Sequence, residues 1–282
     1  MLPDGLDEAN VSKLLDAAIA EDLGNGDITS QAVIPKGTVF QGIVVAREEM
    51  VCAGLSIMEL VFARFSDKIH CEINIEDGIK VSEGTHLVQV QGPAIELLAS
   101  ERTAINILQH LSGIATLTRQ YVKKIEGTGA ILLDTRKTIP GLRELAKYAT
   151  KVGGATNHRM RLDDGVLIKD NHVAVAGSVY EAVRRAKAKH VDNIEVECDT
   201  LNEVAEALQA GANSILLDNM DTETCAKAVE LVAGRVPTEA SGNINLNTIR
   251  EIAETGVNFI SVGRLTHSAR AMNIGLDWNA IG

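Results

Sequence analysis

From residue 128 onward the chain repeats one pattern, and this repeat limits the possible folds more than any other feature. Short apolar runs recur, each followed by a polar cluster and then by a stretch with helical periodicity. The runs do not alternate polar and apolar residues, which is typical of strands buried on both faces of a parallel sheet. There are six: AILLD (130–134), VLIK (166–169), NIEVE (193–197), SILLD (214–218), VPTEAS (236–241) and NFISVG (258–263). The stretch 153–159 is a candidate for a short seventh strand.

Such a sheet can stay open and doubly wound, or it can close into a barrel. An open dinucleotide-binding sheet is disfavoured because no GxGxxG motif follows a strand. Polar residues follow most of the predicted strands, as expected at the mouth of a barrel. We therefore predict a barrel, which need not reach eight strands.

The first part of the chain has a different pattern. Residues 9–23 and 55–65 have helical spacing, and a long helical stretch covers 93–124, with Ser112-Gly113 as a candidate interruption. β-like runs separated by glycine turns predict a largely antiparallel sheet with helices beside it. These runs cover 38–47, 69–77, 79–84 and 85–92.

Composition narrows the possible partners. The 282 residues suffice for one large domain or for a large and a small one. A net charge of −11 argues against nucleic acid and anionic membranes as partners. The four cysteines are scattered without a CxxC motif, and the acidic N-terminus lacks an apolar signal region. We expect a cytoplasmic protein with reduced thiols and no structural zinc.

Against this acidic background, cations gather at predicted strand ends. DTRKTIPGLR (134–143) directly follows a buried run. NHRM (157–160) adds His158 and Arg159, and SGN (241–243) stands at the end of the run VPTEAS. Cations here suit carboxylates or phosphates, glycines allow backbone N–H groups to approach a phosphate, and carboxylates suit ribose hydroxyls or magnesium. The strand-end residues are Arg136, Lys137, His158, Arg159, Lys169, Glu195, Glu197, Asp218, Ser241, Gly242, Asn243, Gly263 and Arg264.

Each of these residues also has a structural interpretation. Arg136 and Lys137 fit a solvated loop, the two glutamates can pair with neighbouring cations, and Asp218 can cap the next helix. Lys169 fits such an interpretation less well, because burying an unpaired ammonium group is costly. Their convergence on one end of one sheet, rather than any single residue, predicts an anion-binding site.

Several motifs resemble one known family. ERTAINILQHLSGIAT, DTRKTIPGLR, NHRMRLDDGVLIKDNH, IEVE, ILLDN, SGNI and FISVG are similar to quinolinate phosphoribosyltransferases, the carboxylating nicotinate-nucleotide pyrophosphorylases. The resemblance implies an α/β protein with an N-terminal α/β sandwich and an incomplete, seven-stranded α/β barrel of the type II phosphoribosyltransferase kind. The implied domains are 1–112, joined by 270–282, and 113–269. One departure is Gly153-Gly154-Ala155, where the family usually has three glycines.

The family's reaction combines quinolinate with phosphoribosyl pyrophosphate (PRPP) and gives nicotinate mononucleotide, pyrophosphate and carbon dioxide, a step of NAD biosynthesis that uses magnesium. The resemblance also implies a head-to-tail homodimer, or a higher assembly of such dimers. In it the sandwich of one subunit covers the barrel mouth of the other, and Arg102 reaches into the partner's site. No nucleic acid or membrane is implied as a partner.

The resemblance assigns roles by position. The dicarboxylate pocket would be lined by Thr135, Arg136, His158, Arg159 and Lys169, with Lys137 near the substrate and the pyrophosphate. Glu197 and Asp218 would hold the ribose hydroxyls and, indirectly, Mg²⁺. Lys137, Lys169, Glu197 and Asp218 would be the catalytic residues. The phosphates would be held by Ser241, Gly242, Asn243, Val262, Gly263, Arg264 and His267.

Three other functions fit parts of the pattern. A phosphoribosyltransferase for a related acceptor such as nicotinate would need fewer cations. A Schiff-base lyase would use Lys169 as its amine. A sensor would keep the pocket and bind both substrates without turnover.

Overall fold

The computed structural model describes residues 2–280, which divide into two compact units. One, called here the N-terminal unit, contains the residues up to Arg119, the segment Ile139–Gly153 and the residues from Ser268 on. The other, called the barrel unit, contains Gln120–Thr138 and Gly154–His267. Among the described residues no helix is both long and apolar enough to span a bilayer.

The N-terminal unit contains an antiparallel sheet with the strand order β12-β1-β5-β3. These strands are β1 (Val39–Ala46), β3 (His70–Ile73), β5 (His86–Pro93) and β12 (Ile274–Ala280), and a separate ladder joins β2 (Met50–Val51) to β4 (Lys80–Val81). In the centre of the sheet Val44 pairs with Val88 on one side and Leu276 on the other. The end of the chain thus forms a strand of this sheet, and β12 was not predicted as a strand.

Five helices belong wholly or mainly to this unit: α1 (Glu8–Leu23), α2 (Ile28–Val33), α3 (Leu55–Phe65), α4 (Ala94–Ile125) and α5 (Arg143–Gly153). The apolar faces of α1, α3, α4 and α5 form one core in which Leu15, Met58, Phe62 and Leu108 are fully buried. The GNGDITS segment that breaks the first helical pattern starts a new helix, because the Asp27 carboxylate accepts the backbone N–H groups of the first turn of α2.

The candidate interruption in the long helix does not occur. α4 is continuous through Ser112 and Gly113, and both residues serve close packing. A Cβ at Gly113 would lie 1.9 Å from the backbone oxygen of Arg270, so only glycine lets the C-terminal segment approach this closely. The Ser112 hydroxyl accepts the N–H of Ala53 at 3.1 Å.

The two units differ from the implied domains in their boundaries. The N-terminal unit extends beyond residue 112 to Arg119 and also takes in α5, a segment assigned to the barrel from the sequence. The reason is hydrophobic packing, because Leu145, Ala146 and Ala149 of α5 are buried in the same core as Leu108.

The barrel unit is built around a six-stranded sheet in the order β6-β11-β10-β9-β8-β7, with every described strand pair parallel. The strands are β6 (Ile131–Leu133), β7 (Val166–Ile168), β8 (Ile194–Cys198), β9 (Ser214–Asp218), β10 (Thr238–Ser241) and β11 (Phe259–Ser261). All six predicted runs are strands. The stretch 153–159 contributes a single parallel bridge, from Thr156 to Leu133, at the seventh position. The α/β architecture with an incomplete barrel is therefore confirmed.

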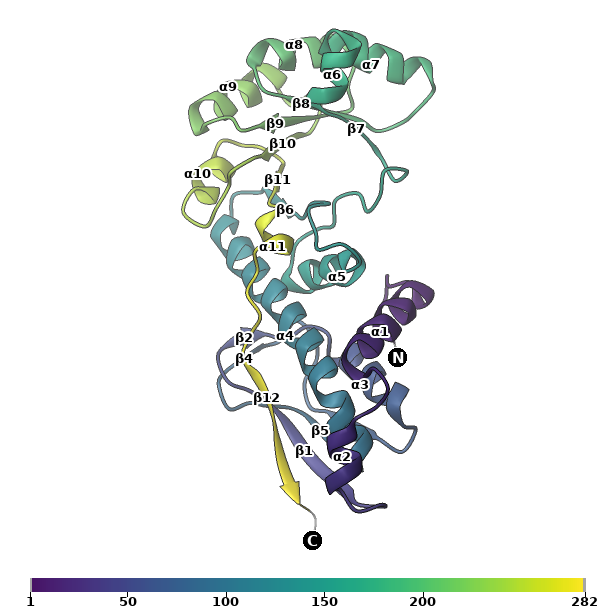
Figure 1. Cartoon of the computed structure of the whole chain (residues 1–282). Helices are drawn as coiled ribbons and strands as arrows, with labels where there is room; N and C mark the ends of the chain where they lie inside the picture. The colour runs from purple at the N-terminus through teal and green to yellow at the C-terminus, as the bar shows by residue number, and fades with distance from the viewer. Residues whose placement is uncertain (1, 281–282) are drawn as a thin grey trace. The chain divides into compact units, whose positions relative to one another are not determined.

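Helices connect these strands as βα repetition requires. They are α6 (Asp170–Ala176), α7 (Val179–Ala188), α8 (Leu201–Ala210), α9 (Thr222–Val232), α10 (Ile249–Glu254) and α11 (Arg264–His267). Helices α7, α8 and α9 lie side by side over the sheet (Figure 1). Because all the strands run the same way, their carboxyl ends share one edge, and that edge carries the candidate site.

Candidate active site

A lysine and a carboxylate meet at the carboxyl ends of β7 and β8. Lys169 Nζ lies 2.5 Å from Glu197 Oε2, and the Glu197 side chain is only 9% exposed. Lys169 occupies the N-cap position of α6, and its backbone N–H donates to Nδ1 of His172 at 2.9 Å. The strand-end lysine is thus paired and its side chain is 46% exposed, so the buried, unpaired ammonium group considered from the sequence does not occur.

Two further carboxylates stand beside Glu197. The ligand oxygens of Glu197, Asp199 and Asp218 lie within 4.8 Å of one another, an all-oxygen set of the kind that Mg²⁺ prefers. Burial and the repulsion of Glu197 and Asp199 raise the pKa of Asp218, while Lys169 and Lys137 act in the opposite direction. A bound cation would therefore stabilise these three carboxylates in their charged form.

At the end of β10 the chain makes a tight glycine turn through Ser241, Gly242 and Asn243. Gly242 has a φ of 91° and Asn243 a φ of 55°, both in the left-handed region. The Asn243 amide donates to Oδ1 of Asn219, the residue that follows Asp218. Ser241 pairs with Asp218 across the two strands, so this turn lies directly beside the carboxylate.

A second close approach occurs after β11. A Cβ at Gly263 would lie 3.1 Å from Nε2 of His267 and 3.2 Å from Cδ of Lys137, so the absence of a side chain lets these two groups come together. The Thr266 hydroxyl donates to the backbone oxygen of Lys137 at 2.7 Å and fixes the DTRK segment against α11. Lys137 and His267 thus belong to the same edge of the sheet.

Two arginines form a cationic pair in this unit. Burial and the nearby Arg136 guanidinium lower the pKa of Arg159. Arg159 Nη1 donates to the backbone oxygen of Gly165 at 2.7 Å, which holds its long side chain in place. Two neighbouring guanidinium groups repel each other, and an anion with two carboxylates would relieve that repulsion.

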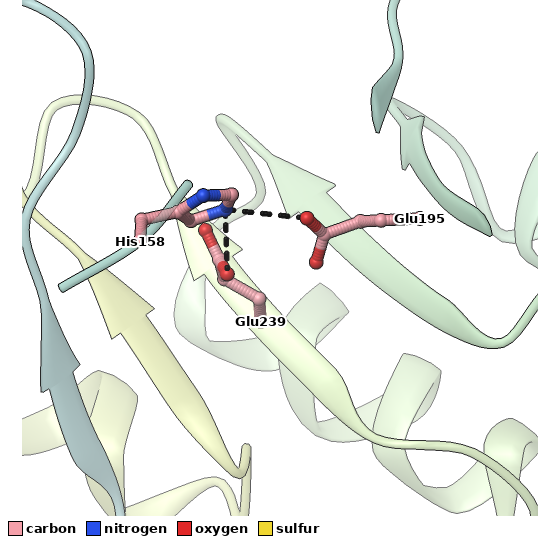
Figure 2. A group of neighbouring side chains, drawn as sticks. All are labelled: His158, Glu195 and Glu239. Carbon is pink, nitrogen blue, oxygen red and sulfur yellow. Dashed lines mark ion pairs between the residues drawn. The ribbon is translucent and has the colours of Figure 1, made fainter. Parts of the chain in front are cut away.

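His158 lies deeper, among carboxylates of the barrel interior (Figure 2). Its Nε2 is 3.2 Å from Glu195 Oε2 and 3.6 Å from Glu239 Oε2. Its Nδ1 accepts the backbone N–H of Arg159 at 2.7 Å. Because Nδ1 is an acceptor, the ring proton is on Nε2 and faces the two glutamates.

The proton on Nε2 of His158 argues against a metal site formed by His158, Glu195 and Glu239. The ligand atoms of His158, Glu195 and Glu239 lie close enough together to hold an ion. A metal-bound histidine needs a lone pair on the coordinating nitrogen, and Nε2 of His158 carries a hydrogen instead. We therefore interpret the group as a cluster held by the contacts of His158 with the two glutamates, and the all-oxygen set at Asp218 as the better cation site.

Glu239 is the least hydrated member of the cluster, with a side chain that is 2% exposed. Burial and the nearby Glu195 raise its pKa to about 7, although His158, Ser261 and Lys169 oppose the shift. Asp134, fully buried at the end of β6, accepts the backbone N–H of His158 at 2.9 Å and the amide of Asn157 at 2.6 Å. The loop carrying His158 and Arg159 is thus held by hydrogen bonds to the buried Asp134.

A cavity of about 430 Å³ adjoins this loop. Its lining includes His158, Arg159 and Asp164 from the loop, Val166 of β7 and Glu195 of β8. Val166 is the first residue of β7, and Asn193 and Glu195 flank the first residue of β8, so the cavity adjoins the amino ends of these two strands. Of the predicted pocket residues, His158 and Arg159 line this cavity and Arg136 and Lys169 do not.

The remaining predicted residues are placed as follows. Thr135 Oγ1 accepts the backbone N–H of Lys137 at 3.0 Å, and the buried Val262 donates its N–H to Leu133 within the sheet. Arg264 is exposed on α11. Its charge opposes the rise in the pKa of Tyr121 that burial causes. Arg102 belongs to the N-terminal unit, on α4, and its side chain is 61% exposed beside Glu101.

Four residues of the site were missed from the sequence: Asp134, Asp199, Asn219 and Glu239. For Glu239 a signal was present, since a glutamate inside the buried run VPTEAS contradicts the rule that buried strands are apolar. Asp199 directly follows IEVEC, so it satisfied the strand-end rule as well as Glu197 did. Asn219 follows Asp218 and was passed over in its favour.

Comparison with known proteins agrees with this geometry. The model of the quinolinate phosphoribosyl transferase C-terminal domain matches residues 114–277, and that of the N-terminal domain matches residues 27–112. The chain belongs to the quinolinate phosphoribosyl transferase family. The expectation drawn from the motifs is therefore confirmed.

Individual relatives support the same assignment to the quinolinate phosphoribosyl transferase family. A probable carboxylating nicotinate-nucleotide pyrophosphorylase of Bacillus subtilis is 40% identical over 96% of this chain and 94% of its own length. The Mycobacterium leprae enzyme of that name is 45% identical over 92% of this chain and 94% of its own. Nicotinate-nucleotide pyrophosphorylase from Francisella tularensis superposes with a TM-score of 0.92 at 37% identity, covering 99% and 98% of the two chains. Human nicotinic acid phosphoribosyltransferase, 14% identical with a TM-score of 0.63, shares the fold alone.

Proposed function

We propose that this protein transfers the phosphoribosyl group of PRPP to quinolinate and releases pyrophosphate and carbon dioxide, giving nicotinate mononucleotide for NAD biosynthesis. The observation that carries the proposal is the combination of a guanidinium pair and a carboxylate set in one barrel unit. Arg136 and Arg159 suit a dianionic ring, while Glu197 and Asp218 suit a sugar and its cation. The family membership makes these the expected substrates.

Quinolinate would be held by its two carboxylates. Arg159 and Arg136 can each form paired hydrogen bonds to a carboxylate, and Lys169 can supply a further charge from the end of β7. Hydrogen bonds to charged groups contribute roughly 1.5–3 kcal/mol each, so a few of them both bind and orient the ring. Orientation would direct the pyridine nitrogen toward the anomeric carbon of the sugar.

The second substrate would lie along the edge formed by β8 to β11. Glu197 and Asp218 would bind the ribose hydroxyls, and the turn from Ser241 to Asn243 together with Gly263 would offer backbone N–H groups to phosphate oxygens. Magnesium fits the carboxylates of Glu197, Asp199 and Asp218, and when bound it would offset the negative charge of the pyrophosphate. Lys137, which like His267 lies beside Gly263, would be placed to bind the departing pyrophosphate.

The chemistry needs little beyond this arrangement. As pyrophosphate leaves, positive charge develops on the ribose, and the carboxylates of Glu197 and Asp218 stabilise it. Once the pyridine nitrogen is bonded to the sugar it is cationic, so it stabilises the carbanion formed as the 2-carboxylate departs as carbon dioxide. That carbon then takes a proton from solvent, which completes nicotinate mononucleotide. No protein nucleophile takes part. The ion pair of Lys169 with Glu197 also argues against a Schiff-base lyase, which requires the unprotonated amine.

The decisive experiment measures carbon dioxide released from quinolinate with and without PRPP. We expect release that depends fully on PRPP and on magnesium, and little product when nicotinate replaces quinolinate. A site built for two carboxylates rejects a monoacid because its cations would stay unpaired. Comparable turnover of both acids would overturn the choice of substrate. Binding of both substrates without pyrophosphate release would instead identify a sensor.

We also propose that the working enzyme is a homodimer in which Arg102 completes the partner's site. The proposal is supported by an exposed arginine, paired only loosely with Glu101 at 3.7 Å, at the position of the family's ERT motif. Arg102→Ala and Lys169→Ala subunits would each be inactive alone. A mixture should regain activity, up to about a quarter of that of the native sites under random pairing, because some mixed dimers hold one intact site. If no mixing ratio restores turnover, the shared site is wrong.

A further inference from the structure

Asn219 makes an unusual set of hydrogen bonds at the mouth of the barrel. Its Nδ2 donates to Asp218 Oδ2 at 2.6 Å, and its Oδ1 accepts from Asn243 Nδ2 at 3.0 Å. Its backbone N–H donates to the backbone oxygen of Ser241 at 2.9 Å. One residue therefore connects the carboxylate at the end of β9 with the glycine turn at the end of β10.

The glycine turn is shaped around this amide. A Cβ at Gly242 would lie 2.2 Å from Oδ1 and 2.7 Å from Cγ of Asn219, too close for any side chain at that position. Asn219 itself has a φ of 53°, a conformation that asparagine tolerates better than most residues. Backbone tolerance alone explains an asparagine at this place. It does not explain why both ends of the amide bind neighbouring groups of the site.

We propose that Asn219 is a positioning residue that fixes the Asp218 carboxylate relative to the Ser241–Asn243 turn, so that the ribose and the phosphate of one substrate are bound together. This inference rests on the proposed function. Both polar atoms of the amide are bonded to the protein, so Asn219 acts through Asp218 and Asn243. A carboxylate bonded to a neighbouring amide loses freedom to rotate, which lowers the cost of ordering it when substrate binds.

Two substitutions separate this role from that of a turn residue. Asn219→Gly keeps the left-handed backbone at no steric cost and removes the amide. Asn219→Asp keeps the shape but places a carboxylate oxygen where Nδ2 now donates, next to Oδ2 of Asp218. The measured quantities are the dissociation constant of PRPP with magnesium, titrated calorimetrically without quinolinate, and the KM of quinolinate at saturating PRPP.

We expect PRPP to bind about tenfold more weakly to Asn219→Gly, the loss of one net hydrogen bond, and about 100-fold more weakly to Asn219→Asp because of like-charge repulsion. The KM of quinolinate should stay within twofold of the wild-type value in Asn219→Gly. His190→Gly is the matched control, because His190 is an exposed residue with a φ of 56° in the loop before β8. It should change neither quantity.

Two results would overturn the inference. One is an Asn219→Asp protein that binds PRPP within twofold of wild type. The other is an Asn219→Gly protein in which both substrates weaken equally and the melting temperature falls, which indicates a structural residue. Wild-type protein that neither binds PRPP nor decarboxylates quinolinate would instead disprove the proposed function, so the two failures are distinct.

Discussion

Both units bury apolar residues, but the barrel unit also gathers acidic side chains inside its sheet, whereas the fully buried Lys147 belongs to the N-terminal unit. The N-terminal unit has one continuous apolar core, built from helices and an antiparallel sheet, in which residues such as Phe62 and Leu108 are fully buried. The barrel unit buries or half-buries His158, Glu195, Glu197 and Glu239 inside its sheet. Barrel interiors are normally filled by branched apolar residues, so the charged interior departs from the usual pattern.

Apolar burial in a core serves stability, whereas the charged groups inside the barrel unit are better explained by function. Burial of apolar surface stabilises a fold, whereas burial of ionisable groups costs free energy unless they are paired. In the barrel unit some pairs are complete, as between Lys169 and Glu197, and others leave like charges together, as between Arg136 and Arg159. The acids Glu195 and Asp164 offset part of this repulsion at Arg159, and clustered charges of this kind are typical of functional sites.

The largest effect should come from the guanidinium pair. Arg159→Ala should lower kcat/KM for quinolinate about 10⁴-fold, about 5.5 kcal/mol, because one substrate carboxylate would lose its partner. The free energy of unfolding should stay nearly unchanged, since the repulsion with Arg136 and the favourable contacts with Gly165, Glu195 and Asp164 are lost together. Steady-state kinetics and urea denaturation measure the two quantities. The control is Arg161→Ala, two residues away, where the side chain is 72% exposed; equal losses in both proteins would contradict the comparison.

The N-terminal core should respond in the opposite way. Phe62→Ala should lower the free energy of unfolding by about 3–5 kcal/mol, because it leaves a cavity in a fully buried site. The kcat of the fraction that stays folded should change little. Val33→Ala, at a position that is 67% exposed, should cost less than about 0.5 kcal/mol in the same urea titration. A small effect at Phe62 would show that this core does not stabilise the unit.

The smallest effect should be a pH dependence of stability. Glu239 has a pKa of about 7 when folded and 4.5 as a free group. Between these values the folded state retains a proton that the unfolded state has lost, so stability falls as pH rises, by up to about 3 kcal/mol in total. Glu239→Gln should remove this fall. Urea denaturation at pH 5, 6 and 7 measures it.

The exposed Glu251 on α10 supplies the control, since Glu251→Gln should leave the pH profile of wild type intact. If Glu239→Gln and wild type lose stability in parallel as pH rises, Glu239 is ionised in the folded protein and the interior is more hydrated than its burial indicates.

Local patterns predicted most of the elements. The helix expected over 55–65 is α3, and all six apolar runs after residue 128 are strands of one parallel sheet. The strand β12 was missed although Ile274, Leu276 and Trp278 alternate with less apolar residues, because the strand with which it pairs, β1, lies far away in the chain. The segment of α5 falls within the implied barrel range 113–269, but its apolar face packs in the core of the N-terminal unit.

By itself the sequence determined which residues stand at strand ends, because a buried strand followed by polar residues is a local pattern that needs no partner. It therefore pointed to Arg136, Lys169 and Asp218 before any coordinates. Only the tertiary structure decided which charges meet. The pairing of Lys169 with Glu197, of His158 with Glu195 and Glu239, and of Asn219 with Asn243 depends on how neighbouring strands align. That alignment is set by packing across the whole sheet, which no short stretch of sequence contains.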